Sequence, residues 1–482
     1  MTSEIIYLPA IEIANKILSF EISVVEVATA FLNQIELHNK RINAITDIRN
    51  KEDILKEAQE KDQLLKKGII LGKMHGLPIT VKDGYNVKGL ISCNGVPNLK
   101  NNIAKDDAEL IKRLKAAGAI IIGKTNLPLF SLDWQTTNSW FGQTNNPYDI
   151  SRVPGGSSGG SSAALAMGFT PLELGSDYGG SIRIPSHFCG ICGLRPTEHA
   201  LPNRGQFVMP GKPQGHRMIT VSGPMARNVG DLIYMMEVLL KTDKQLAEIT
   251  PIDFNSGKWQ KGKLKIAYSS TLNNVEVDKE YSDLLYQFVK KLEENGHQII
   301  HDTPIIDEKL AYSVWAKVYG HEVDASSPAP TFLTKPFMFF FILFKYRDLA
   351  WAKNVFKGIG ISAENYATML NDKDKISDIF SDFLTEYDIW LSPVASFAAF
   401  HHQKAGKAFI VNGKKVPYTK AMGGFNNTTA LSGHPVVVIP IGQTSKGLPL
   451  GIQIHAKKWT DRKLLEIAQY LETLTRGFQK PN

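Results

Sequence analysis

The sequence lacks the features that mark secreted, disulfide-stabilised or membrane-spanning proteins. Only three of its 482 residues are cysteines, which is too few for a disulfide framework and suits a reducing compartment. No apolar run approaches the roughly 18 residues of a membrane-spanning helix. The first residues carry neither the basic segment nor the long apolar stretch of a secretory signal. These absences predict a cytoplasmic protein.

A concentration of charge of one sign is also missing. Lys and Arg number 55 against 47 Asp and Glu, and the formal charge of +8 is spread along the chain. Nucleic-acid-binding proteins more often gather positive charge in a stripe or tail, so we expect no nucleic-acid partner. Hydrophobic residues at 43% and charged residues at 21% are ordinary for a globular protein. A chain of this length buries enough surface to fold without disulfides or metals.

What the sequence does contain is an alternation of helical and strand patterns. Residues from about 10 to 70 show helical spacing, and Asp107 is placed to cap a helix with apolar residues at Leu110, Ile111 and Leu114. Further segments predict four buried strands and a closing helix, at 77–81, 119–122, 435–439, 451–454 and 461–475. Because no linker or repeat divides the chain, we expect one large α/β domain with helices on both faces of a buried sheet.

Two glycine-serine segments carry the chemistry. Pro154–Ser162 holds Ser157, and Asp177–Arg183 holds Ser181, 24 residues further on. A serine becomes a strong nucleophile when a base removes its proton, and glycines let backbone amides crowd around a reacting atom. Lys82 ends the first predicted strand, where burial would favour the neutral amine that acts as a base. Lys82, Ser157 and Ser181 are therefore candidates for acyl transfer without histidine.

Several longer motifs, in order along most of the chain, resemble the amidase signature family. They are His75–Asp83, Gly123–Asn126, Pro154–Ser162, Ser176–Arg183, Phe188–Thr197, Gly223–Arg227 and Gly447–Gln453. The resemblance implies one α/β/α domain over residues 1–482 with a mixed, twisted central sheet. Its parts would be N-terminal helices at 1–70, a signature core at 71–235, a variable substrate or cap region at 245–385, and C-terminal strands and a helix at 386–482.

The resemblance also implies a Ser–cis-Ser–Lys triad. By motif position Ser181 would be the nucleophile, Ser157 the bridging serine with a cis peptide, and Lys82 the terminal base and acid. The reaction would need neither a metal nor an organic cofactor.

Around this triad the resemblance implies an oxyanion hole and a supporting set of side chains. The backbone amides of Tyr178, Gly179 and Gly180, with that of Ser181, would bind the oxyanion. The supporting residues would be Ser158, Asp177 and Arg183. Position 178 is often Thr or Ile in this family and here is Tyr, so the pocket wall would differ while a backbone role would persist.

Other interpretations of these residues are weaker on chemical grounds. Residues 155–159 fit the G-x-S-x-G elbow of an α/β-hydrolase, with Ser157 as nucleophile, but that elbow follows a strand and residues 145–153 are polar and turn-like. The same run lacks the lysine of a phosphate-binding P-loop. Cys189 and Cys192 have C-x-x-C spacing without a second pair to complete a zinc site. We expect them to be buried structural cysteines.

An aromatic segment leaves two interpretations open. Residues 337–344 are all apolar, five of them Phe, and basic residues follow within 345–357. A helix with an aromatic face and a basic rim suits a peripheral membrane contact through residues 336–356, in the region where fatty acid amide hydrolase, a lipid-handling member of the family, carries its membrane-binding cap. The other interpretation is a core helix or the interface of a homodimer.

We therefore predict an amidase that hydrolyses a linear carboxylic amide through an acyl-enzyme. The aromatic segment favours a small-molecule amide with an apolar acyl or aryl group, as for a fatty acid amide hydrolase-like enzyme. Two alternatives come from other classes. One is the glutaminase-type subunit of a tRNA-dependent amidotransferase, and the other is a non-catalytic binding protein on the same scaffold.

Overall fold

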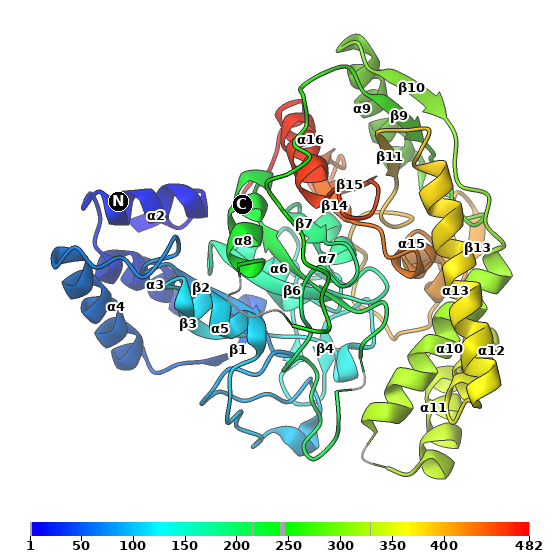
Figure 1. The fold of residues 1–482 in the computed structure, drawn as a ribbon, viewed down its shortest axis with the longest axis horizontal. Helices are drawn as coiled ribbons and strands as arrows, with labels where there is room; N and C mark the ends of the chain where they lie inside the picture. The colour runs from blue at the N-terminus through cyan, green and yellow to red at the C-terminus, as the bar shows by residue number, and fades with distance from the viewer. Residues whose placement is uncertain (1, 215, 242–245, 328, 482) are drawn as a thin grey trace.

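The computed structural model describes residues 2–214, 216–241, 246–327 and 329–481 (Figure 1). Its centre is a sheet of eleven strands in the order β1-β3-β2-β6-β8-β7-β14-β15-β11-β9-β10, with parallel and antiparallel neighbours. In this order the strands are β1 (Ile45–Ile48), β3 (Ile120–Thr125), β2 (Pro78–Lys82), β6 (Leu172–Asp177), β8 (Val221–Ala226), β7 (Cys192–Arg195), β14 (Val436–Gln443), β15 (Pro449–His455), β11 (Ile389–Ser392), β9 (Lys265–Tyr268) and β10 (Gln298–His301). The predicted mixed α/β architecture is confirmed.

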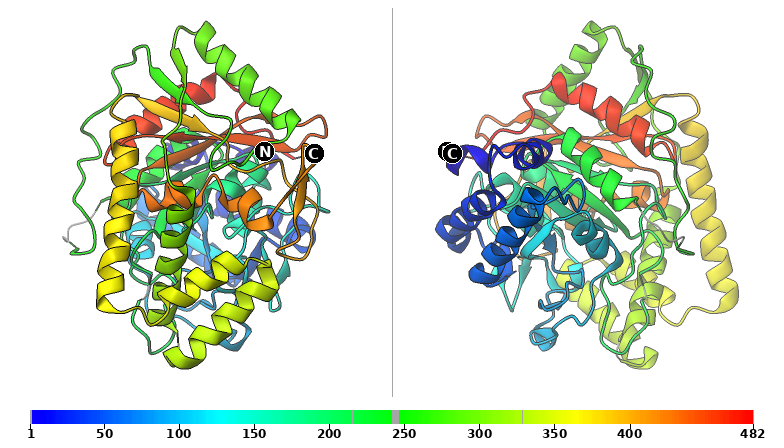
Figure 2. Two further views of the ribbon diagram at one scale, coloured as in Figure 1. Left: turned by 90° about the vertical axis from the view of Figure 1, so that its right-hand side faces the viewer. Right: turned by 60° about the vertical axis from the view of Figure 1, so that its left-hand side comes forward.

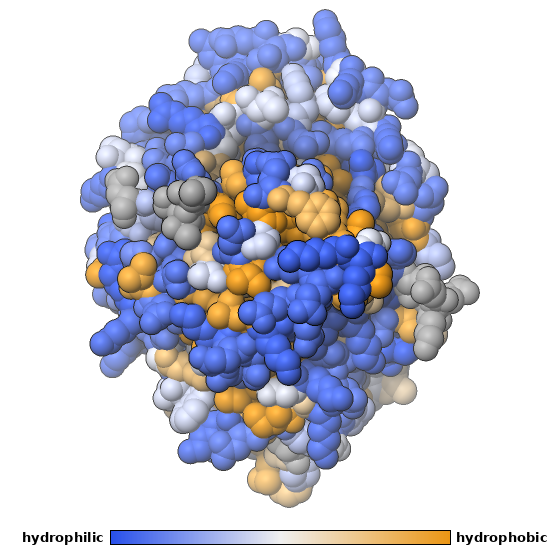
Figure 3. All heavy atoms as spheres, turned by 90° about the vertical axis from the view of Figure 1, so that its left-hand side faces the viewer, coloured by the Kyte–Doolittle hydropathy of each residue, from blue (hydrophilic) through white to orange (hydrophobic). Residues whose placement is uncertain are grey.

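Two groups of helices stand out around this sheet. The N-terminal helices and the group α10 to α13 lie on opposite sides of the molecule (Figure 2). The helices are α1 (Thr2–Ile5), α2 (Ala10–Leu18), α3 (Val24–Ile42), α4 (Lys51–Lys66), α5 (Glu109–Ala116), α6 (Gly159–Ala166), α7 (Arg183–Phe188), α8 (Val229–Leu239), α9 (Lys279–Glu294), α10 (Glu308–Ser326), α11 (Thr331–Tyr346), α12 (Leu349–Gly358), α13 (Ala363–Phe383), α14 (Tyr418–Gly423), α15 (Asn427–Leu431) and α16 (Asp461–Thr473). The face over the N-terminal helices is largely hydrophilic, with apolar side chains gathered near its centre (Figure 3).

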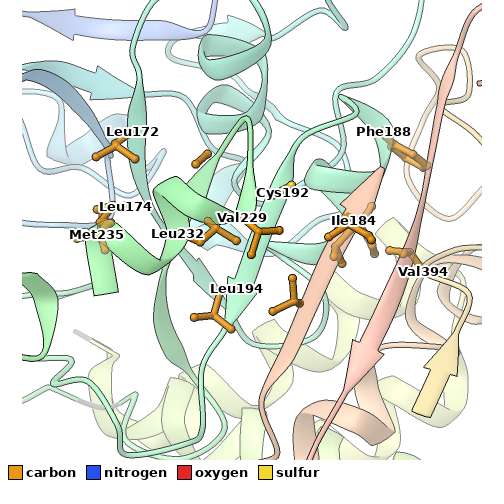
Figure 4. Close-up of a cluster of buried hydrophobic side chains, with 14 of the residues drawn as sticks. Leu172, Leu174, Ile184, Phe188, Cys192, Leu194, Val229, Leu232, Met235 and Val394 are labelled. Atoms are coloured by element: carbon orange, nitrogen blue, oxygen red, sulfur yellow. The ribbon is translucent and has the colours of Figure 1, made fainter. Parts of the chain in front are cut away.

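The core is built where the middle strands meet the short helices behind them. Leu172 and Leu174 of β6, Leu194 of β7 and Leu232 of α8 are fully buried (Figure 4). Burial of such a side chain contributes about 1.5–3 kcal/mol. Ile184 of α7 is also fully buried in this core, so the strand and the helix that flank the Ser181 turn are both anchored in it.

Two local predictions differ from the structure. Asp107 does not cap α5, whose N-cap is Ala108. Instead its carboxylate accepts a hydrogen bond from the Lys88 amide at 2.8 Å and pairs with Lys115 at 2.8 Å. The region 245–385 is also more than a cap, because β9 and β10 lie within it and extend the central sheet.

Candidate active site

Lys82 stands at the end of β2 and is fully buried. Its Nζ donates hydrogen bonds to Ser157 Oγ at 2.7 Å and to Ser176 Oγ at 3.0 Å. Burial disfavours the ammonium form more than the nearby carboxylates favour it, which lowers the pKa of Lys82 to about 7. A lysine in this state is neutral for part of the time at neutral pH and can accept a proton.

Ser157 lies on the loop that precedes α6, and its peptide bond with Gly156 is cis, as expected. A side chain at Gly156 would approach the Asp133 carbonyl oxygen to 2.6 Å, so only glycine fits beside this serine. No strand lies directly before this loop, because residues 144–156 form turns, isolated bridges and irregular segments. The α/β-hydrolase elbow is therefore excluded for this part of the chain.

Ser158 connects the two glycine-serine segments. Its amide donates to the Ser181 carbonyl oxygen at 3.1 Å, and its Oγ donates to the Ser176 carbonyl oxygen at 3.3 Å. Ser157 and Ser181 line the same pocket together with Ser176. The structure thus brings together the three residues that the sequence singled out and adds a fourth.

Asp177 and Arg183 fix the turn that carries Ser181. Arg183 donates from Nε to Asp177 Oδ2 at 3.0 Å and from Nη2 to Oδ1 at 2.9 Å, and both side chains are fully buried. Burial alone would raise the pKa of Asp177, but the charge and hydrogen bonds of Arg183 hold it well below its ordinary value. This ion pair holds the turn in place, and the supporting role of the two residues in catalysis stays a prediction.

The amides of the turn are not all available to an oxyanion. The Gly180 amide donates to Asp177 Oδ1 at 2.9 Å, so the predicted contribution of Gly180 to the oxyanion hole is not supported in this conformation. Among the described residues, no protein atom accepts a hydrogen bond from the backbone amides of Tyr178, Gly179 or Ser181. These three are free to stabilise negative charge at the pocket.

The Tyr178 side chain forms part of an aromatic wall. Its ring lies 5.6 Å from that of Trp315 and 5.7 Å from that of Tyr319, and its hydroxyl donates to the Trp315 carbonyl oxygen at 3.2 Å. Trp351 continues the wall at 5.6 Å from Trp315. The tyrosine that departs from the family pattern therefore ties the Ser181 turn to α10.

Two neighbouring cavities with shared lining residues lie at and beside Ser181. The inner one, of about 60 Å³, contains Ser157, Ser181 and the aromatic wall. The outer one, of about 390 Å³, is mostly apolar and reaches Leu333 and Phe337 of α11. Four residues line both cavities: Phe130, Phe207, His216 and Tyr319. The route from the serines to the surface is thus lined largely by aromatic rings.

Sequence reasoning missed two residues of this site. Ser176 lies inside one of the family-like motifs. Its hydrogen bond to Lys82, however, depends on where β2 and β6 end relative to each other. Phe207 comes from a loop and places its ring 5.7 Å from Lys82 Nζ. No local pattern in the sequence points to it.

The three cysteines are not paired with one another. Cys93, Cys189 and Cys192 are buried free thiols, and Cys189 is in contact with Ser162 Oγ at 3.3 Å. In the described ranges no cluster of His, Cys, Asp and Glu has the size needed to hold a metal ion.

Helix α11 presents two different faces. Thr334, Met338, Ile342 and Tyr346 point inward and are buried. The outer face carries Leu333, Phe337, Phe340 and Phe344, with Phe344 74% exposed. A helix buried all round is therefore excluded. None of the helices in the described ranges is long and apolar enough to cross a membrane.

The chain is similar to known proteins both in sequence and in structure. The Amidase family model matches residues 26–465. An acylamidase of Rhodococcus erythropolis is 29% identical over 97% of this chain and 95% of its own length. A glutamyl-tRNA(Gln) amidotransferase subunit from Alkaliphilus metalliredigens is 29% identical over 94% of this chain and 93% of its own length.

A solved structure of a fatty acid amide hydrolase shares the fold. It superposes with a TM-score of 0.80 over 99% of this chain and 86% of that protein, at 23% identity. At that level of identity the likeness concerns the architecture alone.

Proposed function

This chain belongs to the amidase family and is an amide hydrolase, and we propose that it works through Ser181, Ser157 and Lys82. The observation that carries this proposal is the 2.7 Å hydrogen bond between Lys82 Nζ and Ser157 Oγ beside the Ser181 pocket. It supports a path for the proton of the nucleophile that ends on a buried amine.

In the first half of the reaction Ser181 Oγ attacks the amide carbonyl carbon. Its proton moves to Ser157 Oγ while the Ser157 proton moves to Lys82 Nζ. The amides of Tyr178, Gly179 and Ser181 hold the oxyanion, a contribution that is typically worth a few kcal/mol per donor. Lys82 then returns a proton through Ser157 to the leaving nitrogen, and the C–N bond breaks. The product amine departs and leaves an ester on Ser181.

In the second half water replaces the amine. Lys82, again neutral, takes a proton from water through Ser157 as the water oxygen attacks the ester carbonyl. The same amides hold the second oxyanion. Collapse of this intermediate returns the proton to Ser181 Oγ and releases the carboxylic acid, so the enzyme regains its starting state.

The substrate that fits this site is an amide with an apolar acyl or aryl group. Aromatic rings line the inner cavity, and the outer cavity of about 390 Å³ is mostly apolar. Apolar walls with a few polar groups at one end favour a substrate that buries its chain and exposes its amide to the serines.

We further propose that the outer face of α11 contacts a lipid surface. Leu333 and Phe337 belong both to this exposed face and to the outer cavity. Lys335 and Lys345 border the face, at 4.6 Å from the ring of Phe356 and 5.3 Å from that of Phe341. An aromatic face with a basic rim suits an anionic membrane interface, and an apolar substrate dissolved there would meet the cavity directly.

Substitution of the nucleophile tests the triad. Ser181→Ala should lower kcat for dodecanoyl p-nitroanilide by at least about 10³-fold, with an unchanged Tm. Ser186→Ala is the matched control. This serine lies in α7, outside the cavities, and donates to the Ile182 carbonyl oxygen at 2.8 Å, so its loss should cost about 1 kcal/mol of stability and little activity. Undiminished turnover by Ser181→Ala would overturn the proposal.

A substrate panel separates the chemical alternatives. Dodecanoyl and benzoyl p-nitroanilides should be hydrolysed with higher kcat/KM than acetyl p-nitroanilide or glutamine. Preference for glutamine, joined to co-purification with a second subunit, would instead favour the amidotransferase function that the relative from Alkaliphilus metalliredigens carries in its name. Absence of labelling of Ser181 by a fluorophosphonate would favour a non-catalytic protein.

A further inference from the structure

A fully buried carboxyl group lies in the same layer as Lys82 and has no part in the triad. It belongs to Glu173 of β6. The parallel register of β2 and β6 pairs Thr80 with Glu173. Because side chains alternate along a strand, Thr80, Lys82 and Glu173 point to the same face of the sheet, where α6 covers β2 and β6.

The groups that lie directly beside this carboxyl are hydroxyls rather than charged side chains. The hydroxyls of Thr80, Thr125 and Ser161 lie beside it. Neither carboxylate oxygen, however, has a hydrogen-bond partner of normal geometry among the described residues. Helix α6, with the sequence GGSSAALA, adds no titratable side chain. A buried ion without partners costs several kcal/mol, so this environment favours the neutral acid.

Unlike Glu173, two other acidic residues near Lys82 each form an ion pair with a different basic side chain. Asp177 is paired with Arg183 at 2.9 Å, and Asp83 with Lys124 at 3.5 Å. Lys82 is the cation whose charge acts on Glu173. Tyr85 is buried and donates to the Gly175 carbonyl oxygen at 2.7 Å, and the Glu173 charge contributes to raising its pKa. The ionisations of Glu173 and Lys82 are therefore linked to each other.

We propose that Glu173 is a positioning residue that sets how strongly Lys82 holds its proton, and this inference rests on the triad proposed above. When Glu173 is the neutral acid, Lys82 loses its proton readily and serves as the base. When Glu173 is ionised, its negative charge retains the proton on Lys82 and the base is switched off. Glu173 touches neither substrate nor nucleophile in this scheme.

The direction of the electrostatic effects agrees with this role. Burial raises the pKa of Glu173 to about 8, although the hydroxyls and Lys82 oppose the rise. Burial lowers the pKa of Lys82 to about 7, and a negative charge on Glu173 would raise it again. Two such groups titrate as a pair. Removal of the carboxyl leaves a single lysine with a lower pKa.

The rate at which a fluorophosphonate labels Ser181 tests the inference without an amide substrate. In that reaction Ser181 Oγ attacks phosphorus, fluoride leaves, and the serine proton passes to Lys82. We expect Glu173→Gln to shift the pH of half-maximal labelling rate downward by about one unit, with little change in the maximal rate. Glu173→Ala, which needs no hydrogen-bond partner, should show the same shift and serves if the Gln variant does not fold.

Two controls separate the outcomes. Asp461→Asn removes another buried carboxyl, one that accepts hydrogen bonds from Thr197 at 2.8 and 2.6 Å, so it should lower Tm without a shift in the pH profile. Ser181→Ala should abolish labelling. If wild type is not labelled at Ser181, the proposed function fails. If wild type is labelled but neither Glu173 variant shifts the profile, the role of Glu173 is refuted.

Discussion

At the scale of single residues, the state of Lys82 results from opposing effects. Asp177, Glu173 and Asp83 each favour the ammonium form, while full burial opposes it and has the larger effect. Two hydrogen bonds to serine hydroxyls hold the amine in place without neutralising it. A surface lysine with the same neighbours would stay protonated at neutral pH.

The activity should therefore depend on pH through Lys82. Since its pKa is lowered from 10.5 to about 7, the neutral base is abundant above about pH 7 and disappears below it. We expect kcat/KM for dodecanoyl p-nitroanilide to fall about tenfold per pH unit below pH 7, where Lys82 is protonated. Initial rates from about pH 5 to about pH 9, with circular dichroism at each pH to verify folding, measure the profile. A profile that stays flat down to pH 5 would contradict Lys82 as the base.

At this scale, the sequence motifs identify residues that lie together in the structure. Lys82, Ser157 and Ser181 converge on one site, and the cis bond at Ser157 is present. The hydrogen bond between Lys82 and Ser176 could not be predicted, because it depends on where two strands end relative to each other. The position of Phe207 depends on the path of a loop. The hydrogen bond from the Gly180 amide to the Asp177 carboxylate depends on the geometry of the turn, which the residue types alone do not specify.

At the scale of elements, α11 combines an anchored end with an exposed face. The Tyr346 hydroxyl donates to the Leu132 carbonyl oxygen, and Lys345 pairs with Asp133 at 3.5 Å. Both Leu132 and Asp133 line the inner cavity. The C-terminal end of α11 is thus fixed to the active site, while Phe340 and Phe344 point to solvent with rings stacked at 5.8 Å.

The exposed face should be needed for lipid binding and not for folding. Phe340→Ser with Phe344→Ser should weaken binding to vesicles of phosphatidylcholine and phosphatidylglycerol by at least about tenfold, because full burial of one Phe is worth about 1.5–3 kcal/mol. Vesicle co-sedimentation measures the binding. Turnover of acetyl p-nitroanilide without vesicles should be unchanged.

A substitution elsewhere controls for general loss of apolar surface. Tyr286 on α9 is 65% exposed, and Tyr286→Ser should bind vesicles like the wild type. Sedimentation velocity distinguishes the other interpretation of this face. A wild-type dimer that fails to bind vesicles and becomes monomeric in the double variant would assign α11 to a homodimer interface and contradict the lipid proposal.

Predicted elements were most reliable where apolar runs are long. The strands expected at 119–122 and 435–439 are β3 and β14, and the closing helix is α16. Strands β9 and β10 were missed because each is four residues long. The residues of β10 are exposed or half-buried at the edge of the sheet, so they lack the apolar pattern of a buried strand. The place of this strand pair in the sheet is decided by the pairing of β9 with β11, which is distant in sequence.

At the scale of the whole molecule, one sheet unites segments that are far apart in the chain. Strand β1 from the N-terminal helical region pairs with β3, and β14 from the C-terminal region pairs with β7 of the core. The prediction of a single α/β architecture rested on the absence of linkers. The strand order could not be predicted from sequence, because it is set by long-range pairing rather than by local pattern.

The N-terminal helix α2 packs on α8 through its apolar face and also through the side chain of Asp231. Asp231 of α8 accepts hydrogen bonds from the amides of Ala10 and Ile11, at 2.7 and 3.1 Å, across more than two hundred residues. These amides belong to the first turn of α2, where no partner exists within the helix, and Pro9 at the N-cap supplies no side-chain cap. Asp231 is itself buried, so water cannot take its place.

Asp231→Ala should therefore loosen the N-terminal segment while sparing catalysis. We expect the free energy of unfolding to fall by about 1–3 kcal/mol, because a buried donor is left unsatisfied, and hydrogen exchange to accelerate in residues 10–18. Since α2 contacts α8 and not the Ser181 pocket, kcat/KM should stay within about twofold of the wild type. Asp283→Ala is the control, because Asp283 pairs with Lys279 on the exposed side of α9 and such pairs contribute about 0–1 kcal/mol. Unchanged exchange in residues 10–18 of Asp231→Ala would show that α2 is held by its apolar face alone.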